Sequence, residues 1–410
     1  MHKTVSLTFR ALRHRNYRLF FAGQFVSLTG TWIQQVALSW LIYSLTKSPL
    51  LMGSIMFAGS IPSLLVSPFA GVYIDRVNQY KTLIILQALF MIEAVVVAVL
   101  ALTGIIQVWH IVVLSVLMGI TSAFDMPLRQ AFVVQLIDAS EDLGNAISLN
   151  SSCFNLARLI GPAIAGVIIA SVGEGICFLL NAISYIAVIY ALLLMKIKAK
   201  PIHKKTSVNV IQELKEGFKS AFDSIPIRSI IIFIATTSLI GMSFPVLMPI
   251  FAKEILKGDA QTMGFLMSAS GVGALWGALY LAGKRSVLGL EKWICFASLL
   301  FGTGLVGLAF VDKFWVALAL LFVIGFGMVV IIAACNTMIQ DLVDDDKRGR
   351  IMSLYTMAFM GTAPVGSLCG GAIAEKIGVE HTFLLAGLTM IAAAMIFSTK
   401  LKYFRNSQSD

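Results

Sequence analysis

The sequence predicts an all-α membrane protein with 12 transmembrane helices in two six-helix bundles. Hydrophobic residues make up 58% of the 410 residues, they gather in twelve long runs, and part of the second half repeats the first. Charged residues are only 13%, which is about half the share usual in a soluble protein. Because a soluble fold could not cover so much apolar surface, the composition excludes cytoplasmic enzymes, disordered scaffolds and soluble nucleic-acid binders.

Twelve runs are long enough to cross a bilayer as a helix, which takes about 20 apolar residues. They are 17–45, 50–74, 82–103, 109–136, 146–172, 175–195, 228–252, 262–283, 292–311, 314–340, 351–374 and 382–399. The first run is too long for the apolar core of a secretory signal peptide and lacks an A-x-A cleavage site. We therefore interpret it as a span.

The Lys and Arg residues are distributed unequally between the two sides of these spans. With the N-terminus inside, 24 of the 31 lie at cytoplasmic ends and five in outer loops. This bias predicts a multi-pass protein of the bacterial inner (plasma) membrane with both termini cytoplasmic. The net charge of +10 then reflects topology rather than a nucleic-acid partner.

The one long connection divides the chain into three parts. We expect an N-terminal six-helix bundle over 1–195, a cytoplasmic linker over 196–227 and a C-terminal six-helix bundle over 228–410. The linker is basic at its start and then carries apolar residues at three- and four-residue steps, which favours a helix on the inner membrane surface. Those residues are Val208, Ile211, Leu214, Phe218 and Phe222. A flexible linker is the alternative.

An internal repeat relates the two halves. With a shift of 205 residues, 14 of the 53 positions from Gln135 to Ala187 are identical, where composition alone would give roughly 4 to 6. A weaker match joins Met52 and Gly53 to Met263 and Gly264 at a shift of 211. Parallel six-helix repeats are typical of transporters whose substrate site lies between the halves near the bilayer midplane.

The loop between the second and third spans reads GVYIDRVNQYK from Gly71 to Lys81. It resembles the loop signature of the major facilitator superfamily, G-x-L-x-D-R-x-G-R-[RK]-x. The resemblance implies that Gly71 provides a helix contact while Asp75 and Arg76 hold neighbouring helix ends. With Lys81, these residues form the candidate gating loop. An ordinary polar loop is the alternative.

After Arg76, the loop departs from the signature at three positions. Asn78 replaces a glycine, and asparagine tolerates the left-handed backbone conformation. Gln79 and Tyr80 stand where the family usually has basic residues.

The fifth span carries small residues and a proline that are similar to the family's exporter motif, G-x8-G-x3-G-P-x2-G-G. The matching residues are Ser148, Ala157, Gly161, Pro162, Ala165 and Gly166. In the family this motif accompanies drug/proton exchange. Small residues would let the helix approach one in the opposite half closely, and Pro162 would bend it. Generic small-residue packing is the alternative.

Three longer stretches extend the resemblance over nearly the whole chain. They are 9–21, 123–132 and 347–355. They resemble a bacterial subgroup that includes the enterobactin exporter and macrolide efflux proteins. The resemblance implies a secondary active transporter in which helices 1, 4, 7 and 10 line the central path.

Four charged residues within spans are candidates for proton coupling, because charge is expensive there. Asp125 and Arg158 each lie 13 residues from the turn between the fourth and fifth spans, so antiparallel helices put both at one depth. We predict an Asp125–Arg158 pair as a proton-sensitive latch, with a permanent structural pair as the alternative. Arg129, one turn from Asp125, would compete for it. Glu93 in the third span either carries a proton or makes a local hydrogen bond.

Polar and aromatic residues, together with one methionine, are candidates for lining the substrate path. They are Gln24, Thr31, Trp32, Gln34, Gln35, Asn155, Met242 and Asn336. Such a wall suits an amphipathic solute better than a bare ion. The seventh span also carries Pro245 and Pro249, which predict a broken, mobile helix. The alternative for each polar stripe is packing between helices.

These features predict a proton-coupled exporter, an antiporter of an amphipathic small molecule such as a siderophore or drug, working by alternating access as a monomer. We expect no enzyme activity, no metal and no cofactor: cysteine and histidine spacings match no metal site, and no G-x-x-x-x-G-K-[ST] loop for ATP occurs. A lipid flippase or scramblase on the same scaffold and a non-transporting membrane receptor are the alternatives, and uptake rather than export is also open.

Overall fold

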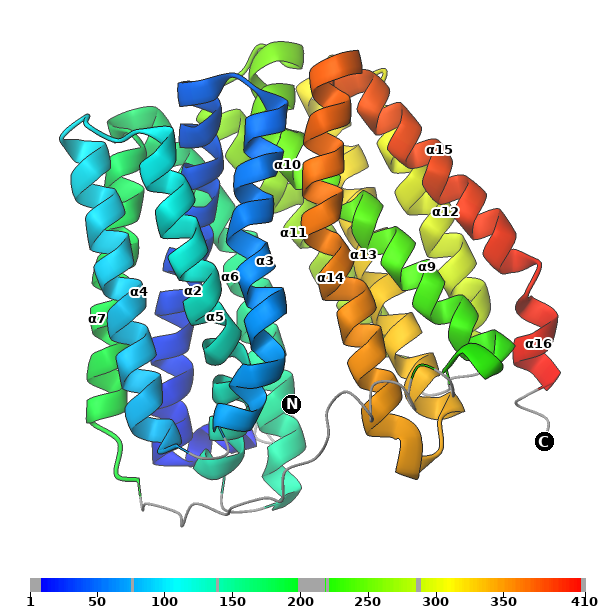
Figure 1. The fold of residues 1–410 in the computed structure, drawn as a ribbon, viewed down its shortest axis with the longest axis horizontal. Helices are drawn as coiled ribbons and strands as arrows, with labels where there is room; N and C mark the ends of the chain where they lie inside the picture. Colours follow the sequence, from blue (N-terminus) through cyan, green and yellow to red (C-terminus); the bar gives the residue numbers. More distant parts are fainter. Residues whose placement is uncertain are drawn as a thin grey trace. The chain divides into compact units, whose positions relative to one another are not determined.

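The computed structural model describes residues 9–74, 77–137, 140–197, 218, 221–284 and 289–406, and every regular element in these ranges is helical (Figure 1). The elements of the first half are η1 (Arg10–Arg13), α2 (Arg15–Thr46), α3 (Pro49–Ile74), α4 (Gln79–Leu102), α5 (Val108–Leu136), α6 (Ser140–Val172) and α7 (Glu174–Leu193). The elements of the second half are α9 (Ile225–Gly241), α10 (Ser243–Ile250), η2 (Phe251–Ile255), α11 (Ala260–Ala282), α12 (Leu290–Leu308), α13 (Phe314–Leu342), α14 (Asp345–Ile377), α15 (Val379–Ser398) and α16 (Leu401–Asn406).

The predicted spans coincide with these helices within a few residues, and the all-helical membrane fold is confirmed. Eleven helices of the described chain are long and apolar enough to cross a membrane, counting Ile225–Ile255 as one. The remaining predicted span is α2, which has 32 residues. Polar residues such as Gln24, Gln34 and Gln35 lower its hydropathy without shortening it.

The seventh span is broken, as its prolines predict. α9 ends at Gly241, α10 begins at Ser243, and a single π-helical turn, η2, follows. Pro249 lies inside α10, where a proline removes one backbone hydrogen bond and prevents a regular helix. The predicted mobility of this span stays a prediction.

Contacts divide the chain into two compact units. Residues 1–45 and 58–205 form the first, and residues 46–57 and 206–410 form the second. The start of α3 therefore belongs with the second unit, where Ser48 Oγ and the Leu50 amide donate to Glu375 over 2.8 and 3.2 Å. The predicted surface helix of the linker lies almost entirely outside the described residues, and the predicted domain boundaries stay predictions.

The helix bounds reproduce the internal repeat. A shift of 205 residues carries α6 onto α14 and α7 onto α15, with 33 and 20 residues in each pair. Gly173 and Gly378, which match in the repeat, begin α7 and α15 at φ of 86° and 84°. Only glycine adopts this backbone conformation without strain. The two halves thus share local geometry as well as sequence.

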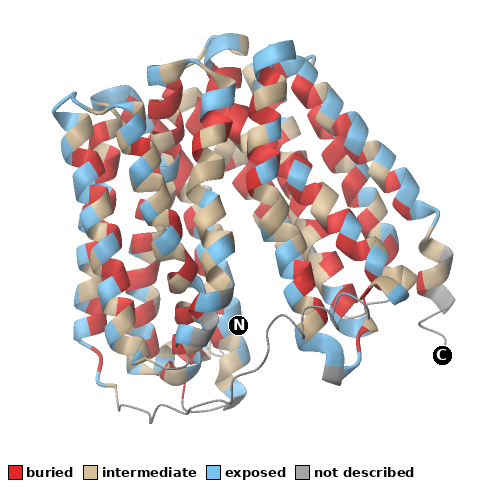
Figure 2. Cartoon of the chain, in the orientation of Figure 1, coloured by how far each residue is buried: buried red, intermediate tan, exposed pale blue. Residues whose placement is uncertain are grey.

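Apolar side chains are exposed on the outer faces of helices, as expected of a protein in lipid. On α4, Ile85, Ile92 and Val99 recur every seven residues and are 58%, 55% and 53% exposed. A soluble protein rarely leaves so long an apolar stripe uncovered. In each unit, buried residues lie on the sides of helices that face their neighbours (Figure 2). The chain is therefore a multi-pass membrane protein.

Candidate functional site

A buried charge cluster joins α5, α2 and α4 in the first unit. Asp125 is 8% exposed, and Arg129, one turn along α5, forms an ion pair with its Oδ2. Arg129 also donates to Gln24 Oε1 on α2, while Gln87 Nε2 on α4 donates to Asp125 Oδ1 over 2.8 Å. The carboxylate is thereby held from two helices. We call Gln24, Gln87, Asp125 and Arg129 the Asp125 cluster.

The Asp125 cluster is incompletely hydrogen-bonded. Gln24 Nε2, Gln87 Oε1 and Arg129 Nε are buried without a partner in the described part of the chain. A buried polar network with unmet donors and acceptors can exchange partners at low cost, because alternative pairings are already within reach. A change in the charge of Asp125 would therefore redistribute hydrogen bonds among three helices.

A second polar cluster lies further along α2 and α4. Gln34 Nε2 donates to Glu93 Oε2 over 3.0 Å, and Asn181 Nδ2 on α7 donates to Gln34 Oε1 over 2.7 Å. Ser184 Oγ donates in turn to Asn181 Oδ1 over 3.1 Å. We predicted that Glu93 either carries a proton or makes a local hydrogen bond, and the structure contains the hydrogen bond. We call Gln34, Glu93, Asn181 and Ser184 the Glu93 cluster.

An aromatic pair lies at the level between the two clusters. Phe90 falls midway between Gln87 and Glu93 on α4, and its ring stacks on Tyr185 with centroids 5.8 Å apart. Gln87 and Glu93 are six residues apart, so the clusters are separated by about 9 Å along the helix axis. The two carboxylates therefore occupy successive depths of one bundle, with apolar rings between them.

Arg158 does not pair with Asp125 in the structure, contrary to the prediction. Its guanidinium lies over the ring of Trp32 on α2, 5.9 Å from the centroid. The hairpin register places the two residues at similar depth but does not determine how α6 is rotated. The ion pair goes instead to Arg129, the competitor that the helical spacing indicated.

The predicted path residues divide into buried and exposed sets. Gln24 and Gln34 are each 2% exposed, and their side chains bond within the first unit. Gln35 is exposed, while Thr31, Trp32, Asn155, Met242 and Asn336 are partly buried. Asn336 Oδ1 accepts from Gln340 Nε2 over 2.5 Å on the same helix, and Met242 lies at the break between α9 and α10. Contact of these residues with a substrate stays a prediction.

The exporter-motif glycine packs closely within its own unit. A Cβ on Gly161 would lie 2.5 Å from Trp32 Cβ on α2, so a small residue is needed for this contact. The predicted approach to the opposite half stays a prediction. Its repeat partner Gly366 packs in the same way on Leu239 of α9. Pro162 lies inside α6 and is buried, as is Gly166.

The candidate gating loop is described only in part. Asp75 and Arg76 lie outside the described residues, and Gly71 lies near the end of α3. The family's glycine suggested a left-handed backbone at Asn78, but Asn78 has φ −73° and caps α4. Its side chain accepts from the Lys81 amide over 3.0 Å. An asparagine gains this N-cap bond in extended backbone, which removes any need for positive φ.

Neutral hydrogen bonds stand where the family signature has basic residues. Gln135 Nε2 on α5 donates to Gln79 Oε1 over 2.8 Å, and the Tyr80 hydroxyl donates to the Leu192 carbonyl on α7 over 3.0 Å. The start of α4 is thus tied to two neighbouring helices without charge.

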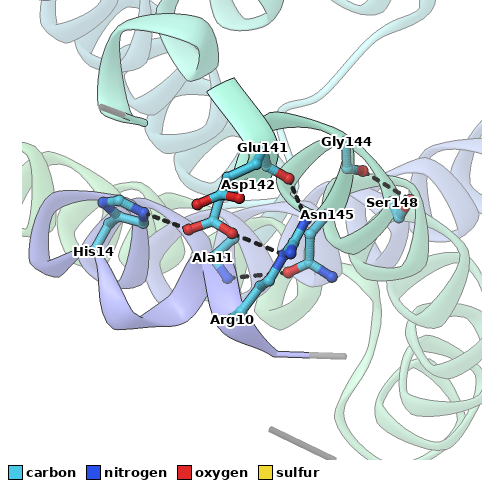
Figure 3. Close-up of polar contacts among 8 residues, drawn as sticks. All are labelled: Arg10, Ala11, His14, Glu141, Asp142, Gly144, Asn145 and Ser148. Atoms are coloured by element: carbon cyan, nitrogen blue, oxygen red, sulfur yellow. Dashed lines mark hydrogen bonds and ion pairs between the residues drawn. The ribbon is translucent and has the colours of Figure 1, made fainter. Parts of the chain in front are cut away.

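The sequence analysis missed a further cluster at the same end of the first unit (Figure 3). Arg10 Nε and His14 Nε2 approach the two oxygens of Asp142 at 2.7 and 3.0 Å. The Ala11 amide donates to Asn145 Oδ1 over 3.0 Å. These contacts fasten η1 to the first turns of α6. An aspartate in the first turn of a helix is common, so its spacing carried no signal.

Gln87 and Asn181 were also missed. Each is a single polar residue within an apolar run and is fully buried. An isolated amide in a span has no periodicity that would distinguish it from its neighbours. Its partner becomes evident only when the helices are packed.

The fold and its buried charges define a polytopic membrane protein of the transporter type, in which ionisable residues are held inside a helix bundle. The chain belongs to the Transmembrane secretion effector family of the major facilitator superfamily, which matches residues 6–409. The predicted superfamily is confirmed, and the protein is a transporter rather than an enzyme.

Two curated relatives and a solved structure are similar over almost their full length. The Staphyloferrin A transporter of Staphylococcus aureus is 28% identical over 382 residues, 93% of this chain and 95% of that protein. Macrolide efflux protein A of Streptococcus pyogenes is 23% identical, covering 94% and 96%. The POT family transporter PepTSo matches with a TM-score of 0.75 at 12% identity, covering 97% and 99%. This last likeness concerns the fold.

Proposed function

We propose that the chain is a proton-coupled exporter that moves an amphipathic small molecule, such as a siderophore or a drug, by alternating access. The observation that carries the proposal is the Asp125 cluster, a buried ion pair whose surroundings hold three unmet hydrogen-bonding atoms. A buried carboxylate inside a membrane bundle is the kind of group that takes up and releases protons during transport.

Protonation of Asp125 would rearrange the cluster in a definite way. The neutral carboxyl loses most of its attraction for Arg129 and becomes a donor as well as an acceptor. Gln87 Oε1, which has no partner in the described chain, is an acceptor for that new donor. Arg129 would then rely on Gln24, so the contact between α5 and α2 changes with the proton.

Glu93 is a second candidate for proton carriage. Its two oxygens accept from one Gln34 amide at 3.0 and 3.4 Å, so lone pairs remain for a proton. The chain of amides through Asn181 connects it to α7. Its role is secondary in the proposal, because it forms no ion pair with any described residue.

The proposed direction of transport and the proposed class of solute are inferred from the names of the relatives and of the family. The names of two of them specify transport of staphyloferrin A and efflux of macrolides, and the family description specifies secretion. We place the protein in the bacterial inner membrane with both termini cytoplasmic, in line with the excess of Lys and Arg at those ends. We expect it to act as a monomer.

Counter-transport in liposomes tests the proposal. The full-length protein is reconstituted with an internal pH dye, a proton gradient is imposed, and staphyloferrin A and a macrolide are offered in turn. Gradient-driven solute movement with matching proton flux is expected, and Asp125→Asn should uncouple the two. Asp344→Asn, which removes an exposed carboxylate, is the matched control.

Three results would contradict the proposal. Solute movement that ignores the gradient would remove the coupling. Movement of labelled phospholipid alone would favour a flippase or scramblase, and saturable binding without any flux would favour a receptor.

A further inference from the structure

Arg158 is a membrane-embedded cation that has no anionic partner among the described residues. It lies 13 residues or more from either end of α6 (Ser140–Val172). In the described chain it makes no ion pair and no hydrogen bond, and its guanidinium lies over the face of Trp32, 5.9 Å from guanidinium carbon to ring centroid. The five N–H donors of a guanidinium in such a place normally meet a carboxylate or a carbonyl.

Two residues of α6 pack against Trp32, the aromatic platform on α2 beneath Arg158. Phe154 meets the Trp32 ring edge-on, with centroids 5.7 Å apart at 67°. Gly161 brings the α6 backbone against Trp32 Cβ. Residues 154, 158 and 161 are spaced at four and three, so they share one helical face that surrounds the indole. The ring is therefore fixed, and the guanidinium is oriented by it.

The polar face of α6 adjoins this platform. Ser148, Ser151 and Ser152 are exposed, and Asn155 is partly so. A polar face in a membrane span faces water or a solute rather than lipid. Asn155 Nδ2 donates to the Ser151 carbonyl over 2.8 Å. Arg158, three residues further on, lies at the border between this face and the aromatic face.

Arg158 remains accessible at that border. Its side chain is partly exposed, and none of its nitrogens is among the buried atoms that lack a partner. A guanidinium presents donors in a planar fork that matches both oxygens of a carboxylate. Asp125, the acid at similar depth, is bound to Arg129, and no described residue supplies Arg158 with an anion, so an anion from outside the chain would complete this site.

We propose that Arg158 is the binding site for an anionic oxygen group, such as a carboxylate, of the exported solute. The apolar part of the solute next to that group would pack against Trp32 and Phe154. The inference rests on the proposed function and narrows its solute class to amphipathic anions. A solute of similar shape without the charge would leave the guanidinium unpaired and bind more weakly.

A matched pair of fluorescent probes tests this inference in the purified full-length protein. Dansylglycine carries a carboxylate, and dansylglycinamide is its neutral counterpart of nearly equal shape. Dansyl accepts energy from tryptophan, so binding near Trp32 is read as sensitised emission. We expect dansylglycine to bind at least tenfold more tightly than the amide, a difference of about 1.4 kcal/mol.

Variants assign the preference to individual residues. Arg158→Gln should remove the preference while leaving the affinity for the amide unchanged, which also shows that the variant is folded. Arg158→Lys should retain part of it, since lysine keeps the charge but not the planar fork. Trp32→Phe should lower the sensitised emission. Arg228→Gln, which removes an exposed arginine at the start of α9, is the control and should keep the full preference.

Equal binding of the two probes by the unmodified protein would overturn the inference, as would absence of binding by both at about millimolar concentration. A charge preference that persists in Arg158→Gln would overturn it too. Because no gradient is applied, these outcomes are separate from those of the transport assay. Loss of proton coupling would leave the probe preference intact, and loss of the preference would leave coupling through Asp125 intact.

Discussion

Gln87 and Asp125 come from different helices, and the amide Nε2 of Gln87 donates to the carboxylate Oδ1 of Asp125 over 2.8 Å. Arg129 donates to the other carboxylate oxygen of Asp125, Oδ2. The carboxylate thus couples α4 to α5 through one amide, and its charge decides how strongly both donors are held. The central prediction about coupling follows from this geometry.

Replacing Asp125 by Asn is expected to abolish gradient-driven transport while exchange of solute at equal pH continues. The asparagine oxygen can still accept from Gln87, but the side chain can no longer gain or lose a proton. We expect at least a tenfold loss of driven transport, equivalent to about 1.4 kcal/mol or more. Parallel measurement of driven uptake and of exchange in liposomes checks it. Full driven transport by the variant would refute the role of Asp125.

Replacing Gly161 by Ala is expected to destabilise the first unit. The new methyl group would lie 2.5 Å from Trp32 Cβ and 3.3 Å from the Thr29 carbonyl, so α6 and α2 must separate. Overpacking of this kind costs about 1–3 kcal/mol, and the thermal unfolding midpoint should fall. Gly144→Ala is the control on the same helix, because nothing lies within 4 Å of its Cβ position. Equal midpoints for the two variants would show that the close contact is unimportant.

Replacing Gly173 or Gly378 by Ala is expected to destabilise the protein by similar amounts. Both residues begin a helix at positive φ, with ψ of 168° and 165°. This region is nearly closed to other residues and costs about 1–3 kcal/mol. Unfolding midpoints of the two variants, compared with Gly349→Ala in an open position of α14, check it. A large effect at one glycine only would contradict equivalence of the repeats.

Replacing Asp142 by Asn is expected to loosen η1 from α6. The carboxylate holds Arg10 and His14 together, and its side chain is only 17% exposed. Loss of its charge should cost about 1 kcal/mol, a modest value because Arg10 is partly solvated. Hydrogen exchange of residues 10–14 should rise, with little change elsewhere. Asp344→Asn removes a pair whose side chains are 76% and 46% exposed and should leave exchange unchanged. No difference between the two variants would argue against the cluster.

Much of the fold could be predicted from the chain alone. The fourth span, predicted as 109–136, is α5 over 108–136, and the break near Met242 follows from two nearby prolines. Hydrophobic length, proline and glycine act within a few residues, so their effects can be read without knowing the partners. The repeat likewise predicted that α14 and α15 would copy α6 and α7.

The candidate site could be predicted only in part. Sequence spacing predicted that Asp125 would form an ion pair with an arginine. Two arginines, Arg129 and Arg158, lie at suitable positions in the sequence. Depth along a hairpin follows from residue counts, but the rotation of a helix about its axis does not. In the structure α6 packs on α2 where Gly161 meets Trp32, Arg158 lies over the indole, and Arg129 forms the ion pair with Asp125.

The sequence by itself determined the number, length and order of the helices, because the transfer of apolar residues into lipid and the pairing of backbone groups within a helix are local. Tertiary structure alone decided the partners: Gln87 for Asp125, Gln34 for Glu93 and an aromatic ring for Arg158. Those choices depend on how closely helices approach and which faces they present. Such distances are set by packing between residues far apart in the chain.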